Sequence, residues 1–204
     1  VYIHAFTDGR DCDPHSGVTY VGDLEDKIKD QQVEIASVIG RYYAMDRDHR
    51  WDRGEKAYRV MVEDGPGTGR SGVEIMQESY SAEITDEFME PVRIAPGAVE
   101  PGDGVLFYNF RPDRARQLTQ AFVDPNFSGF ERSLITPLSF VTMTQYDASL
   151  SVKVAFPPQN LSKILGEVIA EQGLKQFRTA ETEKYAHVTY FFNGGLEEPF
   201  AGEV

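Results

Sequence analysis

The sequence is poor in cysteine and histidine, and this scarcity excludes several kinds of site. Of the 204 residues only Cys12 is a cysteine, so no disulfide can form within the chain. The four histidines are scattered, and no Cys/His spacing matches a zinc site. A P-loop, a Rossmann glycine fingerprint and a GxSxG nucleophile elbow are absent as well. We therefore expect neither a catalytic nucleophile nor a metal site within these residues.

The sequence also lacks long apolar runs and an excess of positive charge. No run of about 18 apolar residues is present, so no membrane span is expected, and no signal peptide is visible. The formal net charge of −13 would repel nucleic acid and anionic lipid from the average surface. These features predict a cytoplasmic protein without nucleic-acid or membrane partners, and the single cysteine fits a reducing compartment.

The two ends of the sequence indicate an internal piece of a longer protein. The chain begins with VYIHAF, which resembles a buried strand already under way, and it stops at GEV without a terminal helix. Trimming of disordered ends is the alternative explanation. We expect that the chain is an internal piece of a longer protein.

The order of apolar and polar segments predicts an α/β fold. An apolar run at 1–6, a turn-rich loop at 7–16, a helical pattern at 17–30 and a buried strand at 33–40 form a β-α-β unit. We expect one domain over 1–204, a three-layer sandwich with a mostly parallel or mixed central sheet flanked by helices. The stretch 91–104 has no helical period and predicts a loop or a small β excursion.

The remaining segments alternate between predicted helices, strands and one charged loop. Asn160 is the expected N-cap of the clearest helix, and Gly173 is placed to end it. Five apolar residues from Leu161 to Ile169, Leu165 among them, follow i, i+3, i+4, i+7, i+8 spacing and predict one apolar face of this helix. The other expected elements are a charged loop at 41–50, helices at 51–62 and 71–80, a central strand at 104–110 continued by a helix to about Phe122, a strand at 138–146, the clearest helix at 160–173, and a short strand at 176–179.

The strongest functional signal is the motif NFRPDRA at residues 109–115. A buried strand ends there and a helix is expected to begin with Pro112 near its first position, where proline fits best. A helix N-terminus offers free N–H groups and partial positive charge, so Arg111 before it and Arg114 in its first turn predict a bound anion. The alternative is a surface ion-pair cluster around Asp113.

Arginine and aspartate alternate in a second motif, RYYAMDRDHRWDR, at residues 41–53. Aspartates can hold guanidinium groups in fixed orientation, and guanidinium binds carboxylate or phosphate bidentately. Arg41 and Arg47 are therefore candidate anion ligands. A solvated salt-bridge loop that contributes little energy is the equal alternative.

Two shorter motifs carry further candidates. In DGRD, directly after the first strand, Arg10 could neutralise a charge while Asp11 hydrogen-bonds a substrate hydroxyl, although a simple DG turn would explain the motif too. In AETEKYAH at 180–187, Lys184 could reach a phosphate as a point charge, although a surface helix is the plainer reading of that segment.

Together these motifs resemble one known family. The strings HAFTDGRD (4–11), GRYYAMDRDHRWDR (40–53), FYNFRPDRARQ (107–117) and AETEKYAHVTYFFNGG (180–195) are similar, in order and approximate spacing, to the cofactor-independent, or 2,3-bisphosphoglycerate-independent, phosphoglycerate mutases. The resemblance covers essentially the whole chain. It identifies the chain as most of the inserted substrate-binding, or phosphotransferase, domain, without the alkaline-phosphatase-like metal domain.

The resemblance implies a function and a set of residue roles. The parent enzyme would interconvert 3-phosphoglycerate and 2-phosphoglycerate in glycolysis through a phosphoserine, with two divalent metals, usually manganese, bound outside these residues. The nucleophilic serine has no counterpart here, so the isolated chain should be inactive. The residues that match substrate-binding positions are Arg10, Asp11, Arg41, Arg47, Arg111, Arg114 and Lys184. The rival hypotheses are a stand-alone small-anion-binding or regulatory module, and a fragment of a metal-dependent phosphatase.

Overall fold

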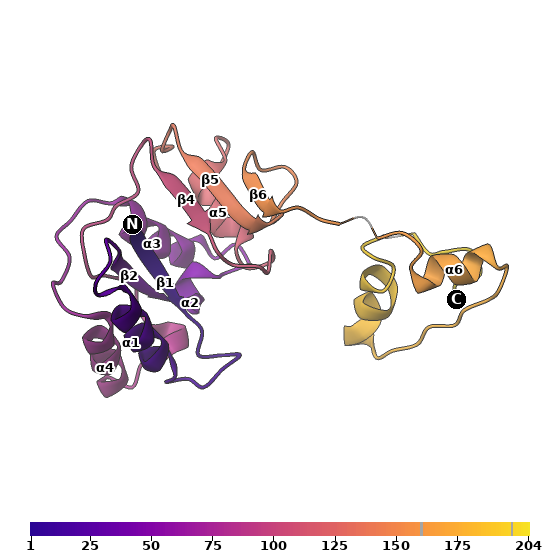
Figure 1. Ribbon diagram of the computed structural model, residues 1–204, viewed down its shortest axis with the longest axis horizontal. Coiled ribbons are helices and arrows are strands. Elements are labelled where there is room, and N and C mark those ends of the chain that lie inside the picture. The colour runs from indigo at the N-terminus through magenta and orange to yellow at the C-terminus, as the bar shows by residue number, and fades with distance from the viewer. Residues whose placement is uncertain (160, 197) are drawn as a thin grey trace. The chain divides into compact units, whose positions relative to one another are not determined.

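The computed structural model describes residues 1–159, 161–196 and 198–204, which fall into two compact units (Figure 1). Unit 1 comprises residues 1–157 and unit 2 comprises residues 158–204. None of the helices in the described ranges is long and apolar enough to cross a membrane.

The first sheet of unit 1 is built on the predicted β-α-β unit. Strand β1 (Tyr2–Thr7) lies parallel to β2 (Glu34–Gly40), and helix α1 (Gly17–Ile28) connects them. A two-residue strand, β3 (Val92–Arg93), adds to the other side of β2 in the antiparallel direction, which agrees with the small β excursion expected there. Because Thr7 pairs with Gly40, β1 and β2 end at the same edge of the sheet.

Helices cover both faces of this sheet, and β2 contributes to a hydrophobic core on each. On one face Val38 packs in a cluster with α1 and with α4 (Gly72–Ser81). On the other, Ile39 packs in a cluster with α3 (Trp51–Val62). Strand β2 is buried from Ile35 to Gly40, in agreement with the buried strand predicted at 33–40.

The second sheet consists of three parallel strands, β4 (Gly104–Phe107), β5 (Ser139–Thr144) and β6 (Lys153–Phe156). Helix α5 (Arg116–Val123) connects β4 to β5. Phe122 of this helix packs against Phe140 at a ring-centroid distance of 5.7 Å, and both belong to the core cluster that contains Ile39. The predicted α/β class is confirmed, with the described strands of unit 1 arranged in two sheets that share one core (Figure 1).

Three local expectations for unit 1 were wrong, and one strand was missed. Strand β4 is at the edge of its sheet rather than central, because β5 lies between β4 and β6. Residues 41–44 form a helical turn, α2 (Arg41–Ala44), instead of loop. Strand β6 was not predicted at all. Helix α5 begins only at Arg116, because Pro112 is part of a turn in which its carbonyl accepts from the N–H groups of Ala115 and Arg116.

Unit 2 contains a short helix, α6 (Leu165–Glu171), and two helical turns, Thr182–Lys184 and His187–Phe191. The predicted N-cap Asn160 lies outside the described residues. The helix begins later than predicted, and Leu165, expected on its buried face, is 58% exposed. Gly173, with φ of +67°, follows the helix as predicted. Instead of a strand at 176–179 there is a single bridge between Gln176 and Glu203.

Candidate functional site

The candidate site begins at the carboxyl ends of β1 and β2. The DGRD loop, residues 8–11, follows β1 directly, and Arg41 follows β2 directly. The two strands are parallel and in register at their ends, so both segments leave the sheet at the same edge. Ligands of open α/β sheets bind outside this edge.

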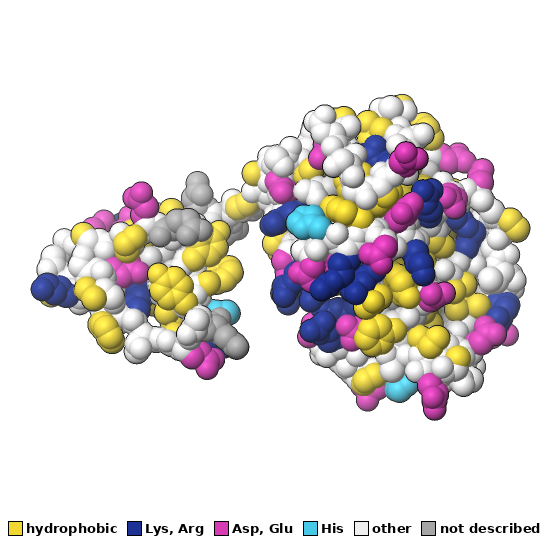
Figure 2. Space-filling model, turned by 180° about the vertical axis from the view of Figure 1, so that it is seen from behind, with side chains coloured by type: hydrophobic (Ala, Val, Ile, Leu, Met, Phe, Trp, Pro, Cys, Tyr) yellow, Lys and Arg dark blue, Asp and Glu magenta, His cyan; other side chains and the backbone are white. Residues whose placement is uncertain are grey.

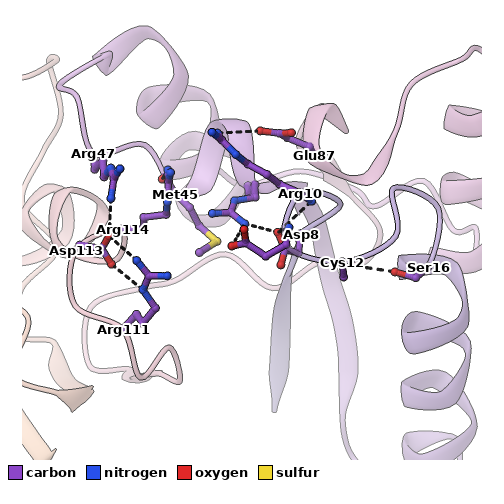
Figure 3. Close-up of polar contacts among 12 residues, drawn as sticks. Asp8, Arg10, Cys12, Ser16, Met45, Arg47, Glu87, Arg111, Asp113 and Arg114 are labelled. Atoms are coloured by element: carbon purple, nitrogen blue, oxygen red, sulfur yellow. Dashed lines mark hydrogen bonds and ion pairs between the residues drawn. The ribbon is translucent and has the colours of Figure 1, made fainter. Parts of the chain in front are cut away.

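Arg41 is the buried centre of this part of the site. Its side chain is only 6% exposed, and Nη1 donates to Asp8 and, at 2.9 Å, to Oδ2 of Asp11. Figure 3 labels Asp8 and Arg10 of the loop that surrounds this guanidinium. Burial alone would lower the pKa of Arg41, but hydrogen bonds to the two carboxylates outweigh it and hold the pKa above its ordinary value. The Nε atom is enclosed and has no hydrogen-bond partner within the described ranges of the chain. Arg41 is therefore a fixed cation whose orientation the DGRD loop determines.

Asp8 organises the loop around this guanidinium. Its Oδ1 accepts from the backbone N–H groups of Arg10 and Asp11, both at 3.3 Å. Partial burial raises the pKa of Asp8, but these hydrogen bonds and the one from Arg41 bring the pKa below its ordinary value. Asp8 is consequently ionised at neutral pH and ties the loop to Arg41.

A second group of charges lies on the turn that precedes α5. Asp113 accepts from Arg47 Nη1 at 2.8 Å and from Arg111 Nη2 at 3.1 Å, so one carboxylate is shared by two arginines from separate loops. Partial burial raises the pKa of Asp113, yet the two guanidinium groups outweigh it and hold the pKa below its usual range. An ion-pair cluster around Asp113 was the alternative to an anion site at the NFRPDRA motif, and this cluster brings Arg47 and Arg111 together.

Arg114 links the two groups of charges. Its Nη1 donates to the Met45 carbonyl at 2.9 Å, and in the described chain it forms no ion pair with a carboxylate. Burial lowers the pKa of Arg114, and the positive charges of Arg41, Arg47 and Arg10 lower it further, against an opposing effect of Asp113. The arrangement therefore places several cations near one guanidinium that, among the described residues, forms no direct ion pair with a carboxylate.

The site is open to solvent. The side chains of Arg10, Arg47 and Arg111 are 58%, 49% and 62% exposed, in contrast to the enclosed Arg41. Arg10 also pairs with Glu87 at 3.6 Å. Figure 2 shows basic side chains gathered on the visible face of unit 1, interleaved with acidic ones. An open surface of this kind can bind a small anion through several guanidinium groups at once.

The structure brings together the predicted residues of unit 1, although not as the sequence predicted. Arg114 is not in the first turn of a helix, because α5 begins two residues later. The predicted partial positive charge of a helix N-terminus around Arg114 is therefore not present. Asp11 contacts Arg41 as an anchor. Lys184 lies exposed in unit 2, at the end of the Thr182–Lys184 turn.

The sequence reasoning missed three groups that shape the site. Asp8 could have been recognised, because it stands at the carboxyl end of a strand beside Arg10. The Met45 carbonyl that holds Arg114 and the Glu87 carboxylate that pairs with Arg10 carry no local signal, because these contacts join segments far apart in the chain.

The described residues offer no metal centre to add to this site. Nowhere in residues 1–159, 161–196 and 198–204 do three or more His, Cys, Asp or Glu side chains lie together in a position to hold a metal ion.

Comparisons with known proteins agree on one family. The family model described as BPG-independent PGAM N-terminus (iPGM_N) matches residues 1–148. The 2,3-bisphosphoglycerate-independent phosphoglycerate mutases of a Nostoc species and of Synechococcus elongatus are 68% and 63% identical to this chain over all 204 residues. A crystal structure of phosphoglycerate mutase from Leishmania mexicana, at low cobalt concentration, superposes with a TM-score of 0.73 at 31% identity.

These matches cover the chain completely but the relatives only in part. The chain spans 38% of the length of the two cyanobacterial mutases and 40% of the Leishmania chain, and in each case the matched region includes 100% of this chain. The family model covers almost all of unit 1, including every arginine of the site. The chain therefore belongs to the BPG-independent PGAM N-terminus family.

Proposed function

We propose that this chain is the substrate-binding part of a 2,3-bisphosphoglycerate-independent phosphoglycerate mutase that interconverts 3-phosphoglycerate and 2-phosphoglycerate. The single observation that carries the proposal is Arg114, a guanidinium surrounded by other arginines and without a carboxylate partner in the described chain. Repulsion among these cations favours the binding of an anion. The names of the relatives supply the identity of that anion.

The chemistry of the substrate fits a site made of guanidinium groups. Each phosphoglycerate carries a carboxylate and a phosphate, and a planar guanidinium can bind either group through two hydrogen bonds. Arg10, Arg41, Arg47, Arg111 and Arg114 come from three separate segments of the chain, so different arginines can hold the two ends of one small molecule. The residues of this chain would thus contribute orientation and charge stabilisation, which are large terms in phosphoryl transfer.

The proposed roles follow the family motifs. Arg10 and Asp11 contact the glycerate oxygens, Arg41 and Arg47 bind the charged groups of the substrate, and Arg111 with Arg114 match the pair at the cleft between the two domains of the parent enzyme. Lys184, in unit 2, matches a family position that approaches the phosphoryl group. The contacts of Arg41 support its role, because a guanidinium held by Asp8 and Asp11 needs little reorganisation to receive a ligand.

The phosphoryl chemistry itself requires groups from outside this chain. We place the phosphorylated serine and the divalent metals in another domain of the same enzyme. The described residues do not fit a metal, since no three acidic, His or Cys side chains gather at one point, and no step proposed here involves one. The 204-residue chain should accordingly bind phosphoglycerate but show no turnover, even with manganese.

Replacement of Arg114 by alanine tests the proposal. In the full-length enzyme, Arg114→Ala should lower kcat/KM by about 100-fold or more, because a charge-stabilising donor is lost from the transition state. In the 204-residue chain it should weaken 3-phosphoglycerate binding measured by calorimetry.

Arg70→Ala is the matched control. Arg70 is an exposed arginine that pairs with Glu78 at 2.7 Å and takes no part in the site, so both measurements should stay near wild type. Near-normal turnover of the Arg114 variant would remove that residue from the site. A wild-type chain that binds inorganic phosphate as tightly as 3-phosphoglycerate would instead favour a general anion-binding module.

A further inference from the structure

One short segment packs against the backbone that precedes Arg10 and against the backbone that precedes Arg41. This segment, Thr85–Met89, contains the 3-10 turn Asp86–Phe88 and lies behind Gly9 and Gly40, the residues that precede Arg10 and Arg41. A methyl group added at Gly9 would lie 2.7 Å from the Asp86 Cβ and from the Glu87 nitrogen. One added at Gly40 would lie 2.5 Å from the Glu87 carbonyl oxygen and 2.7 Å from the Met89 nitrogen. The backbone before Arg10 and the backbone before Arg41 therefore both contact the backbone of the 85–89 segment.

The segment is itself fixed by Asp86, whose side chain is completely buried. Its Oδ2 accepts from the Gly17 N–H at 2.7 Å, at the start of α1, and its Oδ1 accepts from the Tyr80 hydroxyl on α4. Its backbone carbonyl accepts from Thr7 Oγ1 at 2.7 Å, at the end of β1, and its N–H donates to the Pro14 carbonyl at 3.0 Å. One residue therefore ties together both helices on this face of the sheet, the end of β1 and the loop that follows it.

Two further contacts connect the 85–89 segment to Arg41 and to Arg10. The Gly40 N–H donates to the Met89 carbonyl at 2.9 Å, which fixes the backbone immediately before Arg41. The Glu87 carboxylate, 18% exposed, lies 3.6 Å from Arg10 Nη1. The segment consequently limits where both guanidinium groups can lie, although none of its residues is needed to touch a ligand.

We propose that the 85–89 segment, with Asp86 as its positioning residue, sets the separation of Arg10 and Arg41 and so makes the site selective for ligands that carry two anionic groups. The proposal rests on the proposed function, because it deepens the description of that same site. A ligand with a carboxylate and a phosphate must meet guanidinium groups at a defined spacing, and a misplacement of about 1 Å is costly. Inorganic phosphate has a single anionic centre and depends much less on that spacing.

The test uses Gly40→Ala in the 204-residue chain, with Gly104→Ala as its control. Gly40 has φ of −67° and ψ of 145°, which alanine adopts without strain, and the three atoms nearest to the added methyl group all belong to the 85–89 segment. Gly104 has nothing within 4 Å of an added methyl group. Calorimetry should show that Gly40→Ala weakens 3-phosphoglycerate binding by about 10-fold or more and inorganic phosphate binding by less than about 3-fold. Gly104→Ala should change neither.

Amide hydrogen exchange supplies a readout that needs no ligand. The N–H groups of Arg10 and Asp11 donate to Asp8, and their exchange should become faster in Gly40→Ala while the amides of β5 stay protected. Asp86→Asn should act in the same direction, because an amide offers one acceptor oxygen where the carboxylate offers two, and it replaces Gly40→Ala if that variant does not fold.

The outcomes separate this inference from the proposed function. A wild-type chain that binds neither ligand, with faster exchange in the variants, would reject the proposed function and leave the positioning role intact. Retained preference for 3-phosphoglycerate together with unchanged exchange would overturn the positioning role. Equal loss of affinity for both ligands would also overturn it, because a general loss of structure does not discriminate between them.

Discussion

Lowering the pH should destabilise unit 1 through the imidazole of His4. This residue lies on β1, and its Nδ1 is 2.8 Å from the hydroxyl of Ser37, which is fully buried on β2. Burial, and then the nearby charge of Arg93, lower the pKa of His4 from 6.5 to about 4, although a backbone hydrogen bond with Gly97 acts in the opposite direction. The folded chain therefore keeps His4 neutral in mild acid.

The sign and size of the effect follow from proton linkage. The unfolded chain protonates His4 near its ordinary pKa of 6.5, whereas the folded chain does so only near a pKa of about 4. Between these values the unfolded state binds more protons, so stability falls as the pH falls. The two pKa values correspond to a loss of roughly 2 kcal/mol between about pH 7 and about pH 4.5. Asp8 and Asp113, whose pKa values lie below the ordinary range, lose their contributions only at lower pH.

Urea unfolding followed by tryptophan fluorescence can measure this loss. Trp51 is the single tryptophan and packs against Phe127 in unit 1 at 5.0 Å, so its emission reports on the unit that contains His4. His4→Gln should reduce the loss between the two pH values to less than about half of the wild-type value. His187→Gln, at an exposed histidine of unit 2, should leave it unchanged. An unaltered pH dependence in His4→Gln would refute the assignment to this buried imidazole.

Two further substitutions test the local physics of the helices. Gly54→Ala, inside α3, should stabilise unit 1 by about 0.5–1 kcal/mol in the same urea assay, because the nearest atom to the added methyl group is 3.8 Å away and alanine favours helix. Lower stability would indicate hidden crowding. Ser71→Ala should cost about 1 kcal/mol, because the Ser71 hydroxyl and the Glu74 carboxylate cap each other's backbone N–H groups at the start of α4; an unchanged urea midpoint would contradict that cap.

The parts of the fold that sequence could predict are those determined by nearby residues. The β-α-β unit was recognisable because its second strand is mostly apolar and the loop after its first strand is rich in turn residues, and α3 spans the predicted residues 51–62. The same reasoning placed Arg10 and Arg41 at strand ends, where the structure brings them to one edge of the sheet. Periodicity and turn chemistry act over a few residues, so they survive tertiary assembly.

The predictions failed where the structure of a segment depends on contacts with residues far away in the sequence, or where the described residues of its unit leave an apolar face exposed. Strand β6 has only four residues and a weak pattern, and its pairing with β5 is what defines it. The apolar spacing at 160–173 indicated a buried helix face, yet Leu161 and Leu165 are 60% and 58% exposed within unit 2. An amphipathic pattern identifies a face that could be covered, but it does not say what covers it.

The same distinction governs the site, since the motifs supply guanidinium groups and the tertiary structure decides which of them are neutralised. Arg41 is held by two carboxylates from its neighbouring loop, and Arg47 and Arg111 share the single carboxylate of Asp113. In the part of the chain that the structure describes, Arg114 donates only to a carbonyl oxygen. Full pairing of every arginine would leave no attraction for a ligand, and no pairing at all would leave the groups without fixed orientation. Because carboxylates pair with some of these arginines and not with others, Arg41 is held in a fixed orientation, whereas the charge of Arg114 remains available to an anion.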